Sequence, residues 1–205
     1  MAEKNCAIGI FTRSPDVGKV KTRLIPVLGA EKSAQLYRTM IDRTLNTCSH
    51  SGITDIELWC YPETDHPFLN ECANRFNFPL RLQQGRDLGE RMFFAISSML
   101  KEYQYGIITG CDCPGMTSEI LDKTCRMLTD GYDVVIGPSM DGGYYLLGCN
   151  QAVKELFTDM PWGTSTVFAD TRDRIMELNL KFIELEVLHD IDRPEDLEIL
   201  AADPR

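Results

Sequence analysis

The sequence predicts one α/β domain built on a mostly parallel β-sheet that helices cover on both faces. The predicted strands are short apolar runs rather than alternations of apolar and polar residues, which is typical of strands buried on both sides. Stretches with apolar residues at three- and four-residue steps alternate with these runs and indicate amphipathic helices. A chain of 205 residues has the length of one ordinary domain, which we expect to span 1–205.

The first half of the chain predicts a βαβαβ unit of the doubly wound kind. Strands are expected at 6–11, 55–61 and 80–83, and helices at 31–49 and 68–76. The apolar stripe of the helix at 31–49 predicts core positions with no chemistry implied: Tyr37, Met40, Ile41, Thr44, Leu45 and Cys48. Units of this kind bind mononucleotides often enough to favour such a function.

The second half continues the alternation of strands and helices. The run Asp141-Gly142-Gly143 has strong turn chemistry and is expected to join two of the strands. The other expected elements are a helix that begins with a capping box at Asp87 and Glu90, a strand at 106–110, a helix from Thr117 that Gly131 stops, a strand at 133–138, a helix at 165–179, a strand at 181–188 and a terminal helix that Pro194 opens.

Composition narrows the class of partner. The net charge of −10 argues against nucleic acid and anionic membranes, since both attract basic surfaces. No run approaches 18 apolar residues and the first five residues lack a signal-peptide core, so we expect no membrane span and a cytoplasmic protein. The eight cysteines include no C-x-x-C pair, which predicts reduced thiols. Thiolate binding of a metal by Cys111 and Cys113 is not expected.

Asp112 follows directly after the strand at 106–110. In open parallel sheets ligands bind outside the carboxyl ends of the strands, so this carboxylate is aimed at a crevice. We interpret Asp112 as a ligand of a divalent metal. The alternative is that Asp112 only caps a turn before Pro114.

A basic loop follows the first strand. Over 12–24 it carries four cations, Arg13, Lys19, Lys21 and Arg23, together with Gly18 as a turn residue. Such a loop at the carboxyl end of a strand predicts a phosphate cradle, although its spacing is not that of a Walker A motif. The alternative is a solvated basic turn. We assign contacts with the nucleotide to Phe11, Thr12, Arg13, Gly18, Lys19, Lys21 and Arg23.

Three further segments carry candidate contacts. Gly89 and Arg91 are expected beside the basic loop, where they would help to hold the nucleotide; helix capping explains Asp87 and Glu90 but not Arg91. For the sugar or acceptor we assign Asp141, Gly142, Gly143, Tyr144 and Trp162, because carboxylates accept hydrogen bonds from hydroxyls and aromatic rings pack on sugar carbons. The turn alone also explains the glycines, and Trp162 could equally be buried.

Asp190 and Asp192 place two more carboxylates at the end of a predicted strand. If one of them approaches Asp112, like charges about 4 Å apart repel by roughly 4 kcal/mol at an effective dielectric constant of 20. A magnesium or manganese ion held by both carboxylates and by substrate phosphates would remove this repulsion. This consideration favours the metal interpretation of Asp112.

Six ordered motifs together resemble a bacterial family of nucleotide-diphospho-sugar transferase-like proteins with the glycosyltransferase A fold, associated with arsenosugar biosynthesis. The motifs are P-x-x-G-K-x-K-T-R-L (15–24), D-L-G-E-R-M (87–92), D-C-P-G (112–115), G-P-x-x-D-G-G-Y-Y-L-L-G (137–148), W-x-T-S (162–165) and D-I-D-R-P-E-D-L (190–197). The resemblance implies a three-layer α/β/α domain with a mixed sheet.

The wider superfamily includes nucleotidyltransferases as well as glycosyltransferases. The basic loop is similar to that of phospholactate guanylyltransferases. The Asp112 motif and the closing D-x-x-P-E-D-L resemble sugar cytidylyltransferase elements, which implies that Asp112 and Asp192 hold the metal. Cys111 departs from this pattern, because Gly-Thr-Asp is usual where this chain has Gly-Cys-Asp.

The sequence therefore predicts a metal-dependent transferase that moves a sugar from a nucleotide-diphosphate donor to a small acceptor. Lys19, Lys21 and Arg23 would neutralise the leaving diphosphate, with Lys21 assigned a catalytic role. Asp141 would accept the proton of the acceptor. The alternatives are a nucleotidyltransferase that releases pyrophosphate and a non-catalytic nucleotide-binding module.

Overall fold

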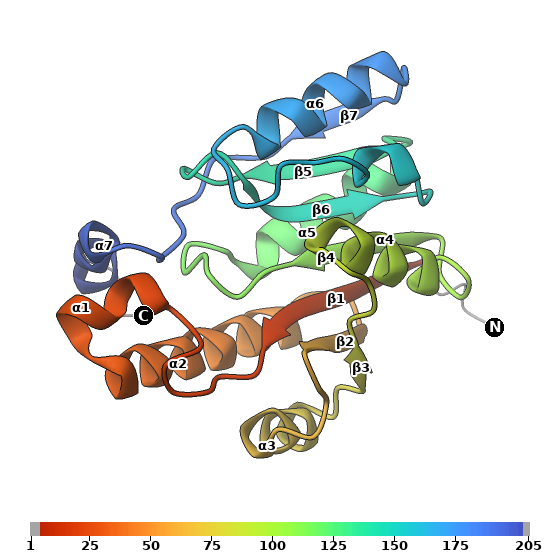
Figure 1. The fold of residues 1–205 in the computed structure, drawn as a ribbon. Helices are drawn as coiled ribbons and strands as arrows, with labels where there is room; N and C mark the ends of the chain where they lie inside the picture. Colours follow the sequence, from red (N-terminus) through yellow and green to blue (C-terminus); the bar gives the residue numbers. More distant parts are fainter. Residues whose placement is uncertain (1–4, 203–205) are drawn as a thin grey trace.

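The computed structural model describes residues 5–202, and Figure 1 shows how the elements are arranged. The two ends of the predicted domain, 1–4 and 203–205, lie outside these residues. The strands are β1 (Cys6–Arg13), β2 (Asp55–Tyr61), β3 (Leu80–Leu82), β4 (Tyr105–Thr109), β5 (Val134–Pro138), β6 (Tyr144–Cys149) and β7 (Phe182–Glu184). The helices are η1 (Thr22–Leu24), α1 (Ile25–Leu28), α2 (Ala30–Ser49), α3 (Pro67–Phe76), α4 (Leu88–Met99), α5 (Ser118–Thr129), η2 (Lys154–Leu156), α6 (Val167–Glu177), η3 (Pro194–Asp196) and α7 (Leu197–Ala202).

The strands form one sheet with the order β3-β2-β1-β4-β6-β5-β7. β6 is antiparallel to both β4 and β5, while the other neighbouring pairs are parallel. The predicted α/β class with a mostly parallel mixed sheet is confirmed. The turn at 139–143 reverses the chain between β5 and β6, as its Asp-Gly-Gly sequence predicts.

Helices cover both faces of the sheet, and each face has its own core. The core beneath α2, α3 and α5 contains Ile8 and Ile10 of β1. The core beneath α4 and α6 contains Ala7 of the same strand. In Figure 1, α4 lies in front of the sheet and α5 behind it. Successive residues of β1 thus point into opposite cores, which is why this strand is an uninterrupted apolar run.

Two expected features differ in detail. The carboxylate of Asp87 accepts a hydrogen bond from the N–H of Glu90, as predicted, but Glu90 accepts from the N–H of Arg86 rather than from that of Asp87. The strand expected at 181–188 is ordered as a strand only over Phe182–Glu184. Its partner β5 ends in Pro138, which has no N–H to donate, so the ladder between the two strands is interrupted before Leu188 pairs again with Ser139.

The carboxyl ends of the parallel strands meet at one edge of the sheet, on the left in Figure 1. The C-terminal segment reaches this edge from β7, and the N–H of Ile191 donates to the carbonyl of Asp112 over 2.9 Å. Ile191 also packs with Leu24 and Met40 in a small third core, against which residues of α1 and α7 lie. The fold therefore brings the basic loop, the end of β4 and the segment at 189–196 together.

Candidate active site

A cavity of about 410 Å³ opens at this edge of the sheet. Many of the residues selected from the sequence line it: Phe11, Thr12, Arg13, Arg91, Asp112, Asp141, Gly143, Tyr144 and Trp162. They come from the ends of β1 and β4, from the β5–β6 turn and from the segments that begin α4 and precede α6. The strand ends therefore converge on one hollow, as the rule for parallel sheets predicts.

Asp112 lines this cavity, and its two carboxylate oxygens have different surroundings. Its Oδ2 lies 3.0 Å from the Nζ of Lys21. Its Oδ1 is buried and has no hydrogen-bond partner. A buried carboxylate oxygen without a partner is costly, and it is the kind of atom that a hard cation would ligate.

Lys21 connects Asp112 with the C-terminal segment. Its side chain is only 4% exposed, and its Nζ lies 3.8 Å from the Oδ1 of Asp192. Burial acts to lower the pKa of the Lys21 ammonium, but the charge of Asp112, the hydrogen bond to it, and the charges of Asp192 and Asp190 raise that pKa overall. Asp192 is also paired with Arg23. Asp112 and Asp192 thus lie on either side of one cation, the ammonium of Lys21.

The protein could supply only some of the ligands of a divalent metal at Asp112. Asp112 and Asp192 offer carboxylate oxygens, which magnesium and manganese prefer. Within residues 5–202, no group of three or more His, Cys, Asp or Glu side chains is arranged to hold an ion. Two carboxylates completed by substrate phosphates and water are nevertheless an ordinary magnesium site.

Cys111, the departure from the usual Gly-Thr-Asp, does not add a ligand. Its thiol is buried and directed at the carbonyl of Phe11, 3.5 Å away. Burial and the charge of Asp112 raise the pKa of this thiol well above its ordinary value, so it stays protonated. All eight cysteines are free in the structure, and seven of them are buried.

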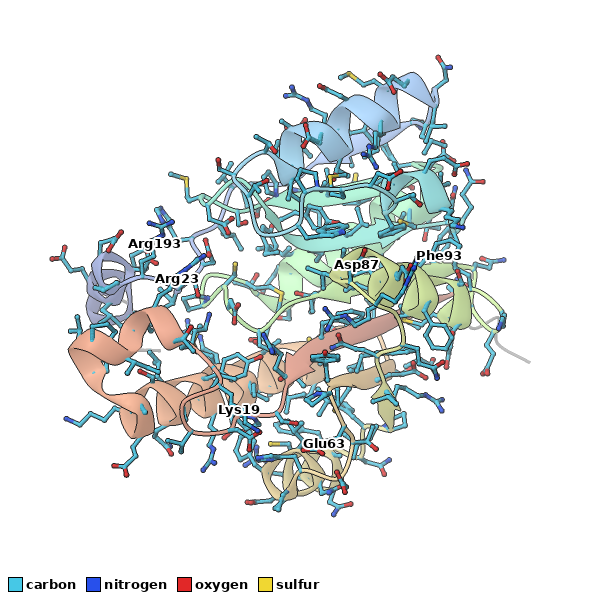
Figure 2. All side chains as sticks on the ribbon, viewed as in Figure 1. Lys19, Arg23, Glu63, Asp87, Phe93 and Arg193 are labelled. Carbon is cyan, nitrogen blue, oxygen red and sulfur yellow. The ribbon has the colours of Figure 1, made fainter. Side chains whose placement is uncertain are left out.

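The cations of the basic loop differ in their surroundings. Lys19, which is labelled in Figure 2, is 75% exposed and pairs with Asp16. It does not line the cavity. Gly18 has a positive φ of 81° and open space around it, which fits a turn residue. Arg23 points to Asp192 rather than into the cavity. Only Arg13 of the four cations lines the cavity itself.

Arg13 and Arg91 stand together at one end of the cavity. Their guanidinium carbons lie 5.6 Å and 4.1 Å from the ring centroid of Tyr61. Neither arginine forms a salt bridge within residues 5–202. Burial lowers the pKa of Arg91, and the neighbouring charge of Arg13 lowers it further. Two adjacent guanidiniums without a salt bridge therefore leave positive charge on this part of the cavity wall, in a chain of net charge −10.

Gly89 does not line the cavity but supports its wall. A Cβ at Gly89 would lie 2.3 Å from the carbonyl oxygen of Phe157 and 2.6 Å from the Nε1 of Trp162. The absence of a side chain at Gly89 therefore lets the first turn of α4 pack closely against Trp162. Trp162 in turn packs edge-on against Tyr144, with ring centroids 6.3 Å apart. Trp162 is half-buried, and together these rings form one side of the hollow.

Asp141 and Asp190 also line the cavity. The Oδ1 of Asp141 accepts hydrogen bonds from the hydroxyl of Ser139 over 2.5 Å and from the N–H of Gly143 over 2.8 Å, so the turn holds this carboxylate in place. Gly142 has a positive φ of 89° and packs against the backbone of Ser165. Partial burial, followed by the charge of Asp141, raises the pKa of Asp190 to about 6.

Sequence reasoning assigned no role in the site to Tyr37 or Gln83. Tyr37 was expected in the core, and it is buried, but its hydroxyl accepts a hydrogen bond from the N–H of Arg13 and its ring lies 5.8 Å from the Nζ of Lys21. Gln83 donates both amide hydrogens to the carbonyls of Thr12 and Trp59. A buried tyrosine needs a hydrogen-bond partner for its hydroxyl. This requirement is the signal in the sequence that could have suggested a polar contact for Tyr37.

The fold and this cavity define a protein of the nucleotide-diphospho-sugar transferase fold class. A crystal structure from Desulfovibrio desulfuricans G20, provisionally assigned as a nucleotide-diphospho-sugar transferase, is 31% identical and superposes with a TM-score of 0.88, covering 98% of this chain and 87% of its own. The chain belongs to the family DUF2064, described as an uncharacterized protein conserved in bacteria, whose family model matches residues 44–164.

More distant structures share the fold alone. A cytidylyltransferase from Leptospira borgpetersenii is 16% identical with a TM-score of 0.67, covering 96% of this chain and 84% of its own. Glucosyl-3-phosphoglycerate synthase from Mycobacterium tuberculosis, in complex with Mn²⁺ and uridine diphosphate, is 12% identical with a TM-score of 0.56, covering 97% and 75%. No curated protein sequence matches the chain. Within residues 5–202, no helix has the length and apolar character needed to cross a membrane.

Proposed function

We propose that this protein is a metal-dependent glycosyltransferase, which moves a sugar from a nucleotide-diphosphate donor to a small acceptor. The observation that carries the proposal is the environment of Asp112. One oxygen of this carboxylate is buried without a partner, the other lies against an ammonium that Asp192 shares, and the residue lines a cavity that Arg13 and Arg91 also line. A carboxylate so placed suits a metal that carries a diphosphate.

The residues of the chain would divide the work along the cavity. Arg13 and Arg91 would bind the nucleotide through their guanidiniums, and the rings of Tyr144 and Trp162 would pack on the sugar. A metal held by Asp112 and Asp192 would neutralise charge that develops on the leaving diphosphate. Asp141 is held through Oδ1, so its Oδ2 is the oxygen that would take the proton of the acceptor hydroxyl.

A cytidylyltransferase shares the fold of this chain, which supports a second candidate. In a nucleotidyltransferase, the same arginines would bind a triphosphate, and a substrate oxygen would attack its α-phosphate and release pyrophosphate. A third candidate is a nucleotide-binding module without turnover. The resemblance of the sequence motifs implies a role in arsenosugar biosynthesis, and this role stays a prediction.

Product analysis tests these candidates together. The protein would be incubated with manganese and either nucleotide-diphosphate sugars or nucleoside triphosphates, each with a panel of small acceptors. We expect free nucleoside diphosphate from the sugar donors and loss of turnover in excess chelator. Pyrophosphate release would instead identify a nucleotidyltransferase, and binding without any turnover would identify the module.

Asp112→Asn provides the matching variant, since it keeps the shape of the side chain but removes the charge. We expect its turnover to fall by about two orders of magnitude or more, because metal ions contribute several kcal/mol to stabilising developing charge. Asp130→Asn is the control, as Asp130 is exposed at the end of α5 and does not line the cavity. Equal activity of both variants would contradict the proposal.

A further inference from the structure

We propose that a second cavity, on the other side of the Asp141 and Asp190 carboxylates, binds the acceptor and selects neutral or cationic polyhydroxylated molecules over anionic ones. This inference rests on the proposed function for the identity of its occupant. The cavity has a volume of about 420 Å³. It lies between the β5–β6 turn, the loop before α6 and the segment at 189–196, with Arg23 at its border.

The two cavities meet at a shared wall. Asp141, Gly163, Thr164 and Asp190 line both of them. A molecule in the second cavity would therefore lie next to the first cavity, without displacing a nucleotide at Arg13 and Arg91. A transferase needs such a meeting point, because the acceptor hydroxyl and the donor must approach within about 3–3.5 Å.

The side chains that line the second cavity carry more negative than positive charge when no metal is bound. Its lining includes five carboxylates, from Asp141, Asp190, Asp192, Glu195 and Asp196, and two guanidiniums, from Arg23 and Arg193, for a formal charge of −3 with His189 neutral. Figure 2 shows the two arginines on the same side of the molecule. An anion entering this cavity would meet repulsion that a neutral or cationic molecule would not.

Several of these carboxylates already form ion pairs or hydrogen bonds with other groups of the protein. Asp192 is paired with Lys21 and Arg23. Asp196 accepts hydrogen bonds from the N–H groups of Asp192 and Arg193. Glu195 and Asp190 form no ion pair within residues 5–202. These two carboxylates are therefore free to accept hydrogen bonds from a bound ligand.

The free groups favour ligands rich in hydrogen-bond donors. Ionised carboxylates only accept, so their natural partners are hydroxyl and ammonium groups. Met140 is the one large apolar side chain in the lining, so the cavity offers little to a lipid. A small polyol, a sugar or an amino sugar fits this chemistry. A phosphorylated or carboxylated acceptor does not.

The reaction that follows is balanced with the groups present. The acceptor oxygen forms a bond to the anomeric carbon as the bond from that carbon to the diphosphate oxygen breaks. The diphosphate leaves with the bonding electrons, and the proton of the acceptor hydroxyl passes to a carboxylate at the shared wall. A neutral hydroxyl is sufficient for this step, which fits sugar transfer better than attack by a phosphate group.

The test compares three probes with the same ring: glucose, protonated glucosamine and glucose 6-phosphate. Their contact with the full-length protein would be measured by saturation-transfer NMR at neutral pH, which detects weak binding without any turnover. We expect glucosamine and glucose to bind and glucose 6-phosphate to bind least. Strongest binding of glucose 6-phosphate, or binding of none of the three, would overturn the proposal.

Two exposed glutamates near the C-terminus locate the binding. Glu195→Lys changes the charge of the cavity by two units, while Glu198→Lys makes the same change on the next turn, outside the cavity. We expect Glu195→Lys to lower the affinity for glucosamine about fivefold and to raise the affinity for glucose 6-phosphate about fivefold. A change of two charge units roughly 8 Å from a charged ligand in water has an effect of this size. Unchanged preferences in Glu195→Lys, or equal changes in both variants, would overturn the assignment.

A separate measurement keeps this inference distinct from the proposed function. Nucleotide binding would be followed by tryptophan fluorescence in manganese with both variants and the parent protein. We expect equal nucleotide affinity in all three, because Glu195 does not line the first cavity. Failure of every nucleotide to bind would contradict the proposed transferase, while the charge preference of the second cavity would still be decided by the NMR result.

Discussion

The Nζ of Lys21 lies 3.0 Å from the Oδ2 of Asp112, and the ammonium occupies the place between two carboxylates where a cation is required. The backbone of Lys21 is left-handed, with φ 47° and ψ 42°, a conformation that costs a side-chain-bearing residue roughly 1–2 kcal/mol. The ion pair and the cation–π contact with Tyr37 offset this strain. The site is therefore held in shape by the protein alone.

Replacing Lys21 should destabilise the fold. Lys21→Met removes the ammonium and leaves Asp112 and Asp192 without their shared cation. We expect a loss of about 1–3 kcal/mol in the free energy of unfolding, less than for a fully buried pair because Asp112 is 47% exposed. Urea unfolding in chelator measures the change, and added manganese should restore part of it.

Lys19→Met is the matched control for Lys21→Met. Lys19 belongs to the same loop, but its side chain is 75% exposed and its ion pair with Asp16 is local. Exposed pairs contribute at most about 1 kcal/mol, and many contribute nothing measurable. If both variants unfolded at the same urea concentration, Lys21 would not be what holds the carboxylates together.

Much of the fold could be predicted from the sequence because its signals are local. Apolar runs located β1, β2, β4 and β5, and the stripe from Tyr37 to Cys48 located α2. The predictions are wrong where the length of an element depends on the strand next to it. The strand expected at 181–188 stops early because its partner β5 ends in Pro138, which has no N–H to donate, and no property of 181–188 itself indicates this.

The site was less predictable because pairing of charges is a property of the tertiary structure. The loop cations looked equivalent in sequence, yet Lys19 pairs with Asp16, Lys21 with Asp112 and Arg23 with Asp192. Of the four loop cations, only Arg13 lines the first cavity, where Arg91 from a distant segment joins it. Residue type and strand position therefore indicated where the site lies, but not which cations stay available for a ligand.

Arg91 should contribute directly to nucleotide affinity. Its guanidinium stacks on Tyr61 in the cavity and has no carboxylate partner within residues 5–202. Arg91→Gln removes a charge-assisted hydrogen bond, which is worth about 1.5–3 kcal/mol, or roughly a 10- to 150-fold loss in affinity. Isothermal titration with a nucleoside diphosphate and manganese measures the loss.

The control for Arg91 is Arg86→Gln. Arg86 precedes the same helix, but it is bound to Glu90 and does not line the cavity. We expect its nucleotide affinity to stay within twofold or so of the parent protein, as usual for an exposed substitution. A loss shared equally by both variants would indicate an effect of overall charge rather than a contact at Arg91.

Asp190 should make the protein less stable as the pH rises. Its pKa is about 6 in the folded protein and 3.8 as an ordinary value, so between these pH values the folded state holds a proton that the unfolded state has lost. The contribution of this group to stability therefore falls from pH 3.8 to pH 6 and stays low above it.

Asp190→Asn tests that pH dependence in excess chelator. We expect the variant to be more stable than the parent protein above pH 6 by roughly 1–2 kcal/mol, a value that discounts the pKa shift for partial exposure. Near pH 3.8 and below, the difference should disappear. A constant difference at every pH would show that the asparagine acts through packing and not through the charge of Asp190.

Gly89 gives a prediction in which two physical effects have opposite signs. Gly89→Ala in the first turn of α4 should stabilise an isolated helix by about 0.8–1 kcal/mol. In the folded protein, however, the new Cβ would lie 2.3 Å from the carbonyl oxygen of Phe157 and 2.6 Å from the Nε1 of Trp162. Because the first contact is with backbone, it cannot be relieved by a side-chain rotation. We expect a net loss of about 1–3 kcal/mol.

Gly110→Ala is the control, since a Cβ at Gly110 meets no atom within 4 Å. Urea unfolding should separate the two variants clearly, with Gly110→Ala close to the parent protein. Gly89→Ala should also shift the emission of Trp162, because the indole must move away from α4 and towards the cavity. A stability equal to or above that of the parent protein would mean that α4 does not pack against Trp162 as closely as the structure has it, and the aromatic wall of the cavity would then need another support.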